Sequence, residues 1–220
     1  MYKYIKRFFD FFFSILGITL LLPLMLPLIV LLFCTGEHHI FYLQKRIGYK
    51  NRVFRIWKFA TMLRNSPDMG TGDITLKNDS RVLPVGKFLR KTKINEVPQL
   101  VNIVTGQMSF VGARPLMKQS FDLYSEEVKK VIYNSPPGIT GLASIVFRDE
   151  ESVIASSGKM PREFYEKEIL PYKGELEQWY QRHQSFYLDF IILLLTFWIV
   201  IFPQSRLVYK VYRSLPQRPF

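Results

Sequence analysis

Apolar positions dominate the first part of the chain and run almost without interruption over residues 8–33. As one straight helix at about 1.5 Å per residue, this stretch would reach ~39 Å, more than the ~30 Å hydrocarbon core of a bilayer. Pro23 and Pro27 lie inside it, and proline removes a helical hydrogen bond and clashes with the preceding turn. The pattern therefore predicts two short arms around a break at Pro23, forming a re-entrant membrane hairpin of residues 1–36. A tilted spanning helix with a proline kink is the alternative.

Basic residues collect on both sides of this stretch. Residues 1–60 hold nine Lys and Arg against two acidic residues, and residues 204–220 hold four basic residues and no acid. These two regions carry nearly all of the net charge of +12. Because Lys and Arg concentrate on the cytoplasmic side of membranes, both flanks of the hairpin are expected in the cytoplasm, against anionic lipid headgroups. A nucleic-acid-binding protein would instead place a basic stripe on its soluble domain, so nucleic acid is not expected as a partner.

Two single residues of the apolar stretch carry expectations of their own. Asp10 lies at its entrance, where an unpaired carboxylate would be costly. Lys6 and Arg7 share its helix face, so we expect an ion pair at headgroup depth that anchors the helix. Cys34 is the only cysteine, which excludes an internal disulfide, and it is expected to be a small buried apolar residue rather than an acylation site. No small-residue cleavage site follows the stretch, so the segment is expected to stay in the chain.

A second apolar run covers residues 190–202, where Pro203 ends it. As a helix it would measure roughly 20 Å, which is short of a bilayer crossing. With the basic residues that follow, the run predicts a helix at the membrane interface, within a membrane-associated C-terminal region of residues 185–220. A crossing of a thinned membrane is the alternative.

Between the two apolar regions, shorter patterns predict one catalytic domain of residues 37–184 on the cytoplasmic side. Residues 65–80 are rich in Gly, Asp and Asn, as is typical of a loop, and residues 136–141 predict a rigid loop whose glycines suit close approach to a ligand. The chain is therefore expected to be an α+β protein, mainly helical, with a small β-hairpin. Strands are expected at 40–44 and 53–59 around a turn at 48–51, and helices at 85–90, 96–104, 116–132 and 161–184, the last interrupted at Pro171 and Gly174.

The densest group of chemically notable residues lies at positions 90–100 and 106–115. Asn95 has a side chain suited to capping a helix that begins at Glu96, with Pro98 tolerated in its first turn. On that structural interpretation, Glu96 only favours the positive end of the helix dipole. On a functional interpretation, the free N–H groups of the helix start form a phosphate site with nearby basic side chains. These basic side chains are Arg90, Lys91, Lys93 and Arg114.

Several ordered motifs, with Pro23, carry a resemblance to a known family. They are Lys6-Arg7-Phe8-Phe9-Asp10, Trp57-Lys58-Phe59-Ala60-Thr61-Met62, Asn95-Glu96-Val97-Pro98-Gln99-Leu100, Met108-Ser109-Phe110-Val111-Gly112-Ala113-Arg114-Pro115 and Pro137-Gly138-Ile139-Thr140-Gly141. The chain resembles the bacterial sugar transferases, the monotopic phosphoglycosyl transferases, over nearly its whole length. The resemblance implies transfer of a sugar 1-phosphate from a nucleotide sugar, usually a UDP-sugar, to a polyprenyl phosphate such as undecaprenyl phosphate, with Mg²⁺ as cofactor.

The same resemblance implies the products, the place and the site. The products would be a polyprenyl diphosphate sugar and a nucleoside monophosphate, which would start a surface glycan such as exopolysaccharide, lipopolysaccharide or capsule. The enzyme would lie on the cytoplasmic face of the bacterial inner membrane, with a homo-oligomer and downstream glycosyltransferases open as further partners. The expected site residues are Asn95, Glu96 and Arg114 for catalysis, Glu96 for the metal, Lys58, Arg90 and Arg114 for substrate phosphate, and Pro23 for the break in the membrane hairpin.

One position departs from the family pattern. Members carry an Asp-Glu dyad whose Asp acts as nucleophile through a phosphosugar-enzyme intermediate, and this chain has Asn95 in place of that Asp. A neutral amide cannot replace a carboxylate nucleophile. Either Glu96 takes over the role, or another acid supplies it, or the chain is a poor catalyst; the motif set favours activity with an altered carboxylate arrangement. Ala113, where proline is usual, and Ala60, where lysine is frequent, are smaller departures. The candidates for another acid are Asp149, Glu150 and Glu151.

Two further function classes and several lesser residues complete the expectations. A catalytically weak or inactive membrane adaptor of the same fold is the alternative that Asn95 favours, and a tethered nucleic-acid binder is disfavoured by charge. His38, His39 and His183 lack the spacing of a metal site, and His38 and His39 are expected as an interfacial pair. Asp79 and Arg81 match an Asp-x-Arg pattern of the family, as a structural turn with an ion pair or as a substrate contact.

Overall fold

The computed structural model describes residues 1–220 except 36, 67–68, 70–78 and 220. Helices make up most of the described chain, and the strands form two separate two-stranded sheets. The expected α+β class, mainly helical, is confirmed. The helices are α1 (Tyr2–Cys34), α2 (Pro84–Lys91), α3 (Gln99–Val104), α4 (Lys118–Asp122), α5 (Glu126–Val131), α6 (Leu142–Val146), α7 (Glu150–Ser156), α8 (Pro161–Phe164), α9 (Leu170–His183), α10 (Phe186–Ile201) and α11 (Leu207–Val211), and the strands are β1 (Phe41–Ile47), β2 (Val53–Phe59), β3 (Ser109–Val111) and β4 (Gly138–Thr140).

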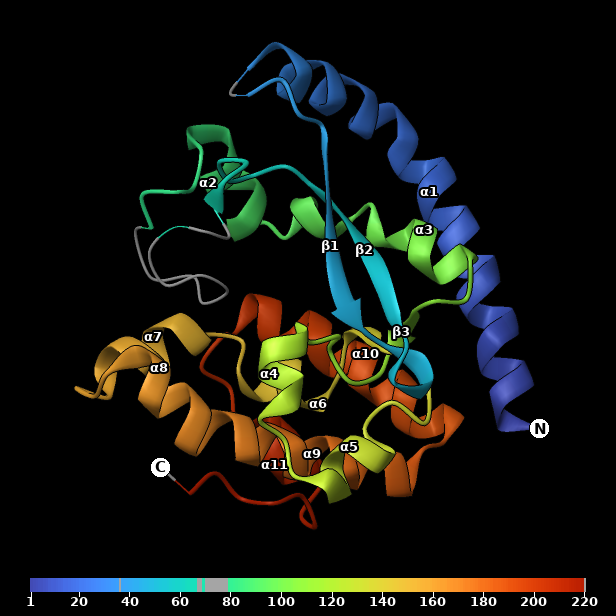
Figure 1. Ribbon diagram of the computed structural model, residues 1–220. Helices are drawn as coiled ribbons and strands as arrows, with labels where there is room; N and C mark the ends of the chain where they lie inside the picture. Colours follow the sequence, from blue (N-terminus) through green and yellow to red (C-terminus); the bar gives the residue numbers. More distant parts are fainter. Residues whose placement is uncertain (36, 67–68, 70–78, 220) are drawn as a thin grey trace.

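Helix α1 is continuous, and neither Pro23 nor Pro27 ends it. The predicted interruption is therefore wrong, because apolar residues on both sides of the prolines pack against the rest of the protein and hold the helical path. Leu21 packs beside α3, and Met25 packs on a cluster that includes Phe59 of β2. The helix curves along one side of the molecule and leans over the β1–β2 hairpin (Figure 1). Within the described residues, α1 is the one helix long and apolar enough to cross a membrane.

The first turns of α1 are fixed to the domain by buried polar side chains. Asp10 accepts hydrogen bonds from the Ser109 hydroxyl and the Phe110 amide, both at 3.1 Å. Lys6 forms an ion pair with Asp189 at the start of α10, with 2.5 Å between Nζ and Oδ2. The predicted pairing of Asp10 with Lys6 or Arg7 is therefore wrong, because each of these side chains has a partner on another element. Arg7 donates to the carbonyl oxygens of Ile103 and Val104 at the end of α3, at 2.5 and 2.6 Å.

The predicted β-hairpin is confirmed as the antiparallel pair β1–β2, whose register places Tyr42 opposite Lys58. Its turn holds a short 3-10 helix, η1 (Tyr49–Asn51), in which Lys50 and Asn51 have positive φ. A parallel pair, β3–β4, was not expected. It forms where residues 136–141 approach Gly112. The glycines of this segment, expected to allow close approach to a ligand, thus bring its backbone close to β3 and the residues that follow β3.

The C-terminal helices build the largest hydrophobic core. Helix α10 begins at Phe186, capped by the Ser185 hydroxyl, which accepts from the Leu188 amide, so the predicted helix at residues 190–202 is confirmed with an earlier start. One face of α10 is buried and the opposite face exposes large apolar side chains, among them Phe190 and Phe197. The buried face of α10 contributes Leu188, Ile192 and Leu195 to a core with Leu176 of α9, Val208 of α11 and Leu215.

The predicted domain boundaries, at 36/37 and 184/185, stay predictions.

Two helix predictions and one burial prediction need correction. The helix expected at 116–132 is divided into α4 and α5, because Ser125 caps a new helix by accepting from the Val128 amide. The segment from α8 to α9 is not interrupted at Pro171 or Gly174. A π-helical turn, η4 (Tyr165–Ile169), leads directly into α9, and Pro171 lies in the first turn of α9, where proline is tolerated. Cys34, expected to be buried, is exposed at the end of α1.

Candidate active site

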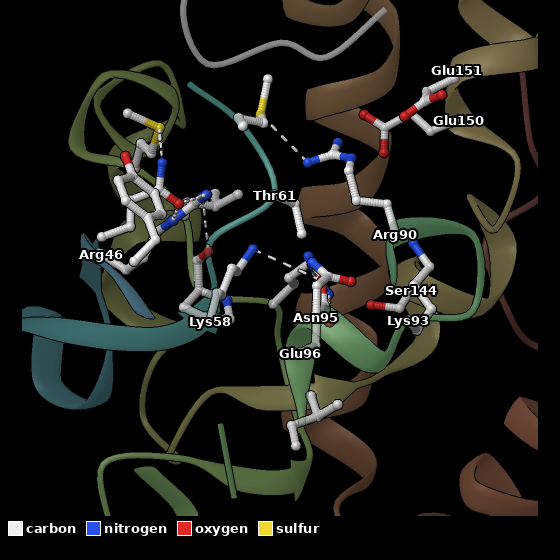
Figure 2. Close-up of a pocket in the computed structure, with 18 of the residues that line it drawn as sticks. Arg46, Lys58, Thr61, Arg90, Lys93, Asn95, Glu96, Ser144, Glu150 and Glu151 are labelled. Atoms are coloured by element: carbon white, nitrogen blue, oxygen red, sulfur yellow. Dashed lines mark hydrogen bonds and ion pairs between the residues drawn. The ribbon is translucent and has the colours of Figure 1, made fainter. Parts of the chain in front are cut away.

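A large open cavity of about 2050 Å³ lies among the β-hairpin, α3, the segment after β3, and helices α6, α7, α9 and α10. Part of its lining is apolar and comes from the two apolar helices, through Leu21 of α1 and Ile199 and Val200 of α10. The remainder is rich in charged side chains (Figure 2). The cavity therefore joins the apolar helices to a charged interior.

Glu96 lies in this charged interior at the end of a 3-10 turn, η3 (Ile94–Glu96), where it meets two cations. Arg114 Nη2 is 2.5 Å from Glu96 Oε1, and Arg114 Nη1 is 3.3 Å from Oε2, so the guanidinium grips both carboxylate oxygens. Lys58 Nζ, on β2, is 3.8 Å from Oε1. Three of the predicted site residues, separated by up to 56 positions in the sequence, are thus brought together.

The surroundings of Glu96 hold it in the charged form. Burial raises the pKa of Glu96, but Arg114, Lys58 and Lys93 outweigh burial and bring the pKa well below its usual range. The same geometry acts in the opposite direction on Lys58. Burial lowers the pKa of Lys58 to about 7, because Glu96 offsets only part of the combined effect of burial and the arginines around it.

Further cations surround this group and outnumber the single carboxylate. Arg46 on β1 is half-buried, and its desolvation together with Arg114 lowers its pKa to about 10. Lys93 and Arg90 line the same cavity, and Arg90 Nη1 contacts the Met62 sulfur at 3.5 Å. Five basic side chains thus face Glu96 or the space beside it. A surplus of positive charge in a cavity attracts and binds an anion.

Asn95 is buried beside Glu96, but it does not cap a helix. Lys93 adopts a left-handed conformation with φ of 60° and starts η3, which makes Asn95 the middle residue of that turn. Helix α3 begins only at Gln99, after Pro98, so the predicted capping role is wrong. The Asn95 Oδ1 atom is buried and has no hydrogen-bond partner within the described part of the chain. A ligand in the cavity would supply the partner that this oxygen lacks.

The candidate alternative acids lie on a different wall of the cavity. Glu150 and Glu151 are across the cavity from Arg46 in Figure 2. Glu150 forms an ion pair with Lys173 of α9, at 2.6 Å between Oε2 and Nζ, and its charge helps to raise the pKa of Arg114. Asp149 precedes α7 and lines the same wall. None of these acids is paired with the cations that hold Glu96, within the residues that the structure describes.

Residues outside the predicted set also line the cavity. Arg46 could have been anticipated from strand alternation, because β1 residues two positions apart share the hairpin face that carries Lys58. Glu177 could have been anticipated as the one acid on the buried face of α9, among Leu176 and Tyr180. Ser144 of α6 carries no sequence signal, since its place depends on how the loop before α6 packs.

The remaining candidate residues have structural surroundings. Arg81 and Asp79 form a buried ion pair at 2.6 Å, and Arg81 also donates to the carbonyl oxygen of Ser66. This agrees with the structural alternative. His183 stacks on Trp179 with ring centres 4.2 Å apart, while His38 and His39 are exposed. Pro23 lies inside α1 and not in the charged interior.

A family comparison agrees with this geometry. The family model described as "Bacterial sugar transferase" matches residues 1–203. The chain is 35% identical over 167 residues to the UDP-N-acetylgalactosamine-undecaprenyl-phosphate N-acetylgalactosaminephosphotransferase of Aeromonas hydrophila. This alignment covers 75% of this chain and 39% of that protein. It is 36% identical over 162 residues to the exopolysaccharide production protein ExoY of Rhizobium meliloti, covering 67% of this chain and 71% of the relative.

A third relative is the UDP-galactose-lipid carrier transferase of Erwinia amylovora, 32% identical over 213 residues, which cover 90% of this chain and 41% of that protein. The chain spans about two fifths of the length of the Aeromonas and Erwinia relatives. The protein belongs to the bacterial sugar transferase family.

Proposed function

We propose that the protein transfers a sugar 1-phosphate from a nucleotide sugar, a UDP-sugar in the first instance, to polyprenyl phosphate. The products would be a polyprenyl diphosphate sugar and a nucleoside monophosphate, and the step would start a surface glycan. The observation that carries the proposal is the cavity itself, in which a cation-rich interior around Glu96 opens beside apolar side chains of α1 and α10. One substrate of this reaction is a water-soluble dianion and the other is a lipid with a phosphate head, and such a cavity suits both.

The charged side chains have distinct parts to play in this reaction. Arg114 and Lys58 would bind the phosphoryl group that is being transferred and stabilise the charge that develops on it in the transition state, as cationic side chains do in phosphoryl transfer. Glu96 holds the Arg114 guanidinium in one orientation, because both guanidinium nitrogens contact its carboxylate. Arg90 and Lys93 would bind the other phosphate of the donor. Fixing both phosphates in one cavity supplies much of the rate through positioning.

Magnesium fits the residues beside Arg114 in one respect. The buried Asn95 Oδ1 lacks a partner among the described residues and adjoins the Glu96 carboxylate, and Mg²⁺ is commonly bound by one or two protein oxygens together with substrate phosphates. Asn95 and Glu96 would hold the ion, which when bound would neutralise phosphate charge. Activity measured with and without a divalent-metal chelator tests this assignment.

The membrane arrangement forms part of the proposal. The first turns of α1 contact β3, α3 and α10, and its last turns pack on β2 and α2. Both ends of α1 are therefore held by the same domain, which favours entry and exit of the helix on one face of the bilayer, the cytoplasmic face. Cysteines introduced at Lys3 and Tyr49, with Cys34 replaced by serine, should react alike with an impermeant reagent. Reaction from opposite faces would contradict the re-entrant arrangement.

The decisive test is transfer in membranes that contain the protein. Labelled UDP-sugars, polyprenyl phosphate and Mg²⁺ should give labelled lipid, and a product mass identifies the sugar. The relatives act, by their names, on N-acetylgalactosamine and galactose, so several donors belong in the screen. Formation of no lipid product with any donor would contradict the proposal.

A second candidate function is favoured by Asn95, which stands where the family has its nucleophilic Asp. A catalytically weak or inactive membrane adaptor would bind the donor or lipid phosphate without turnover. Donor binding in the same preparation, measured together with product formation, separates the two functions.

A further inference from the structure

Glu177 is a buried acid that the reaction proposed above does not use. It lies on the inner face of α9, the residue is only 3% exposed, and it lines the same cavity as Glu96. Neither of its carboxylate oxygens has a hydrogen-bond partner of ordinary geometry among the described residues. The Ala143 amide is close enough to lower the pKa of Glu177, but it does not complete such a bond. Nearly all buried polar groups in proteins are hydrogen-bonded, so the lack of a partner for this carboxylate needs an explanation.

A second polar group without a partner lies on the neighbouring element. The Ser144 hydroxyl of α6 is buried, has no hydrogen-bond partner in the part of the chain that the structure describes, and lines the cavity (Figure 2). Helix α6 packs against α9, and a Cβ added at Gly141, just before α6, would lie 3.8 Å from Glu177 Oε1. The two groups together offer a carboxylate acceptor and a hydroxyl that both donates and accepts.

This pair lies next to the cations that surround Glu96. A Cβ added at Gly141 would also lie 2.3 Å from the Gly112 carbonyl oxygen, so the start of α6 touches the segment that leads into Arg114. In a donor nucleotide sugar, the sugar ring is bonded directly to the phosphate that is transferred. A ring attached to a phosphate at Arg114 would therefore meet the α6–α9 wall.

A cation is a poorer match for the same wall than a ring that carries hydroxyl groups. Lys173, one turn before Glu177 on α9, and Arg148 both line the cavity and add positive charge near it. The described residues include no group of three or more His, Cys, Asp and Glu side chains that could hold a metal. Sugar hydroxyls, by contrast, donate to carboxylates in charge-assisted hydrogen bonds.

We propose that Glu177 and Ser144 bind hydroxyl groups of the sugar ring that is transferred, and so form the sugar-recognition end of the cavity. The inference rests on the proposed function, because it takes the donor to be a nucleotide sugar. It assigns the phosphates to the cations around Glu96 and the sugar to the α6–α9 wall.

The test measures binding of UDP and of the UDP-sugar accepted by the wild-type protein, in detergent micelles or lipid nanodiscs. Glu177→Gln should weaken UDP-sugar binding about tenfold or more and leave UDP binding unchanged, since hydrogen bonds to a charged acceptor are each worth a factor of this size. Ser144→Ala should have a smaller effect in the same direction. Glu175→Gln is the matched control, because Glu175 is exposed on the same helix, and it should bind both ligands as the wild type does.

Donor analogues make the test independent of how well the variant folds. UDP-sugars that lack one ring hydroxyl should bind the wild-type protein more weakly, and for one of them the loss should disappear in Glu177→Gln. Equal weakening of UDP and UDP-sugar, or no weakening of either, would overturn the proposal and assign Glu177 to the ribose or to the fold. A protein that forms no lipid product but still prefers the UDP-sugar to UDP through Glu177 would contradict the transfer function alone.

Discussion

Two glutamates line one cavity under opposite conditions. Glu96 is gripped by Arg114 and faces Lys58, and its pKa lies well below the usual range. Glu177 has no ion pair among the described residues, and burial raises its pKa to about 7 even though the Ala143 amide and Lys173 act against the rise. The two residues are chemically identical, so the difference comes from which elements the fold places beside each one.

The contrast separates two kinds of work within the cavity. A carboxylate held charged by cations can orient them and tolerate an anionic ligand, as Glu96 does for Arg114. A carboxylate without a partner is kept at a cost to stability, which is common where a binding site is built for a ligand. Changing the charge at either position tests this division directly.

The largest effect is expected from Glu96→Gln. The substitution leaves Arg114 without its anionic partner and frees its guanidinium to rotate, so transfer should fall by about 10²- to 10³-fold, the scale seen when one preorganised electrostatic contact is lost. Initial rates of lipid product formation measure it. Asp122→Asn is the control, because Asp122 forms only a surface ion pair with Lys118. Retention of most activity would direct attention to Asp149 or Glu150.

A stability effect that depends on pH is expected from Glu177→Gln. The folded-state pKa of about 7 lies above the ordinary value of 4.5, so the folded protein holds this proton more tightly than the unfolded chain does. Stability contributed by the bound proton is present in full below pH 4.5 and is lost as the pH rises to about 7. At 1.36 kcal/mol per pKa unit this amounts to roughly 3 kcal/mol, which glutamine would not lose.

Thermal unfolding at pH 5 and pH 8 measures this difference. Glu177→Gln should gain stability relative to the wild type on going from pH 5 to pH 8, whereas Glu175→Gln should follow the wild type at both values. A variant that is less stable than the wild type by the same amount at both pH values would show that the carboxylate serves the fold in its charged form.

A gain of function is expected from Asn95→Asp. The new carboxylate would enter the cation-rich surroundings of Glu96, where Lys58, Lys93 and Arg114 favour its charged form. It would restore the acid that the family uses as nucleophile, so turnover should rise at least about tenfold, with a phosphosugar adduct detectable by mass spectrometry. Asn134→Asp, at an exposed position, is the control. Unchanged turnover without an adduct would show that catalysis in this chain does not pass through position 95.

The smallest effect is expected from Lys173→Met. Lys173 lowers the pKa of Glu177 in part, so removal of its charge should move the pH midpoint of the stability change upward by less than about one unit. Lys167→Met serves as the control, since Lys167 is fully exposed and pairs with Glu163 on the surface. A midpoint that does not move would separate Lys173 from the electrostatics of Glu177.

The sequence predicts the elements whose signals are local. The hairpin follows from aromatic and β-branched residues on either side of a turn, and the apolar run at 190–202 predicts most of α10, although not its start at Phe186. The division of the segment at 116–132 depends on the Ser125 cap, which competes with continuing periodicity. The continuity of α1 through Pro23 depends on packing partners, which no local pattern contains.

The site divides in the same way. Motifs identified Lys58, Glu96 and Arg114, and the structure brings the three into contact. Their pairing could not be derived from spacing, because it depends on β2, η3 and the segment after β3 meeting in space. The buried position of Glu177 follows from the apolar face of α9, but the lack of hydrogen-bond partners for its carboxylate among the described residues does not, because it depends on which elements pack against that face.

The attachment of the first turns of α1 to the domain has a practical consequence for the design of a water-soluble variant of this protein. Asp10 bonds to Ser109 and Phe110 of the strand that leads to Arg114, and Leu21 forms part of the cavity wall. Deletion of α1 would remove its apolar surface, but it would also open the wall of the cavity and leave that strand without its hydrogen bonds to Asp10. Solubility is better sought by recoding the outward-facing side chains of the helix than by deleting it.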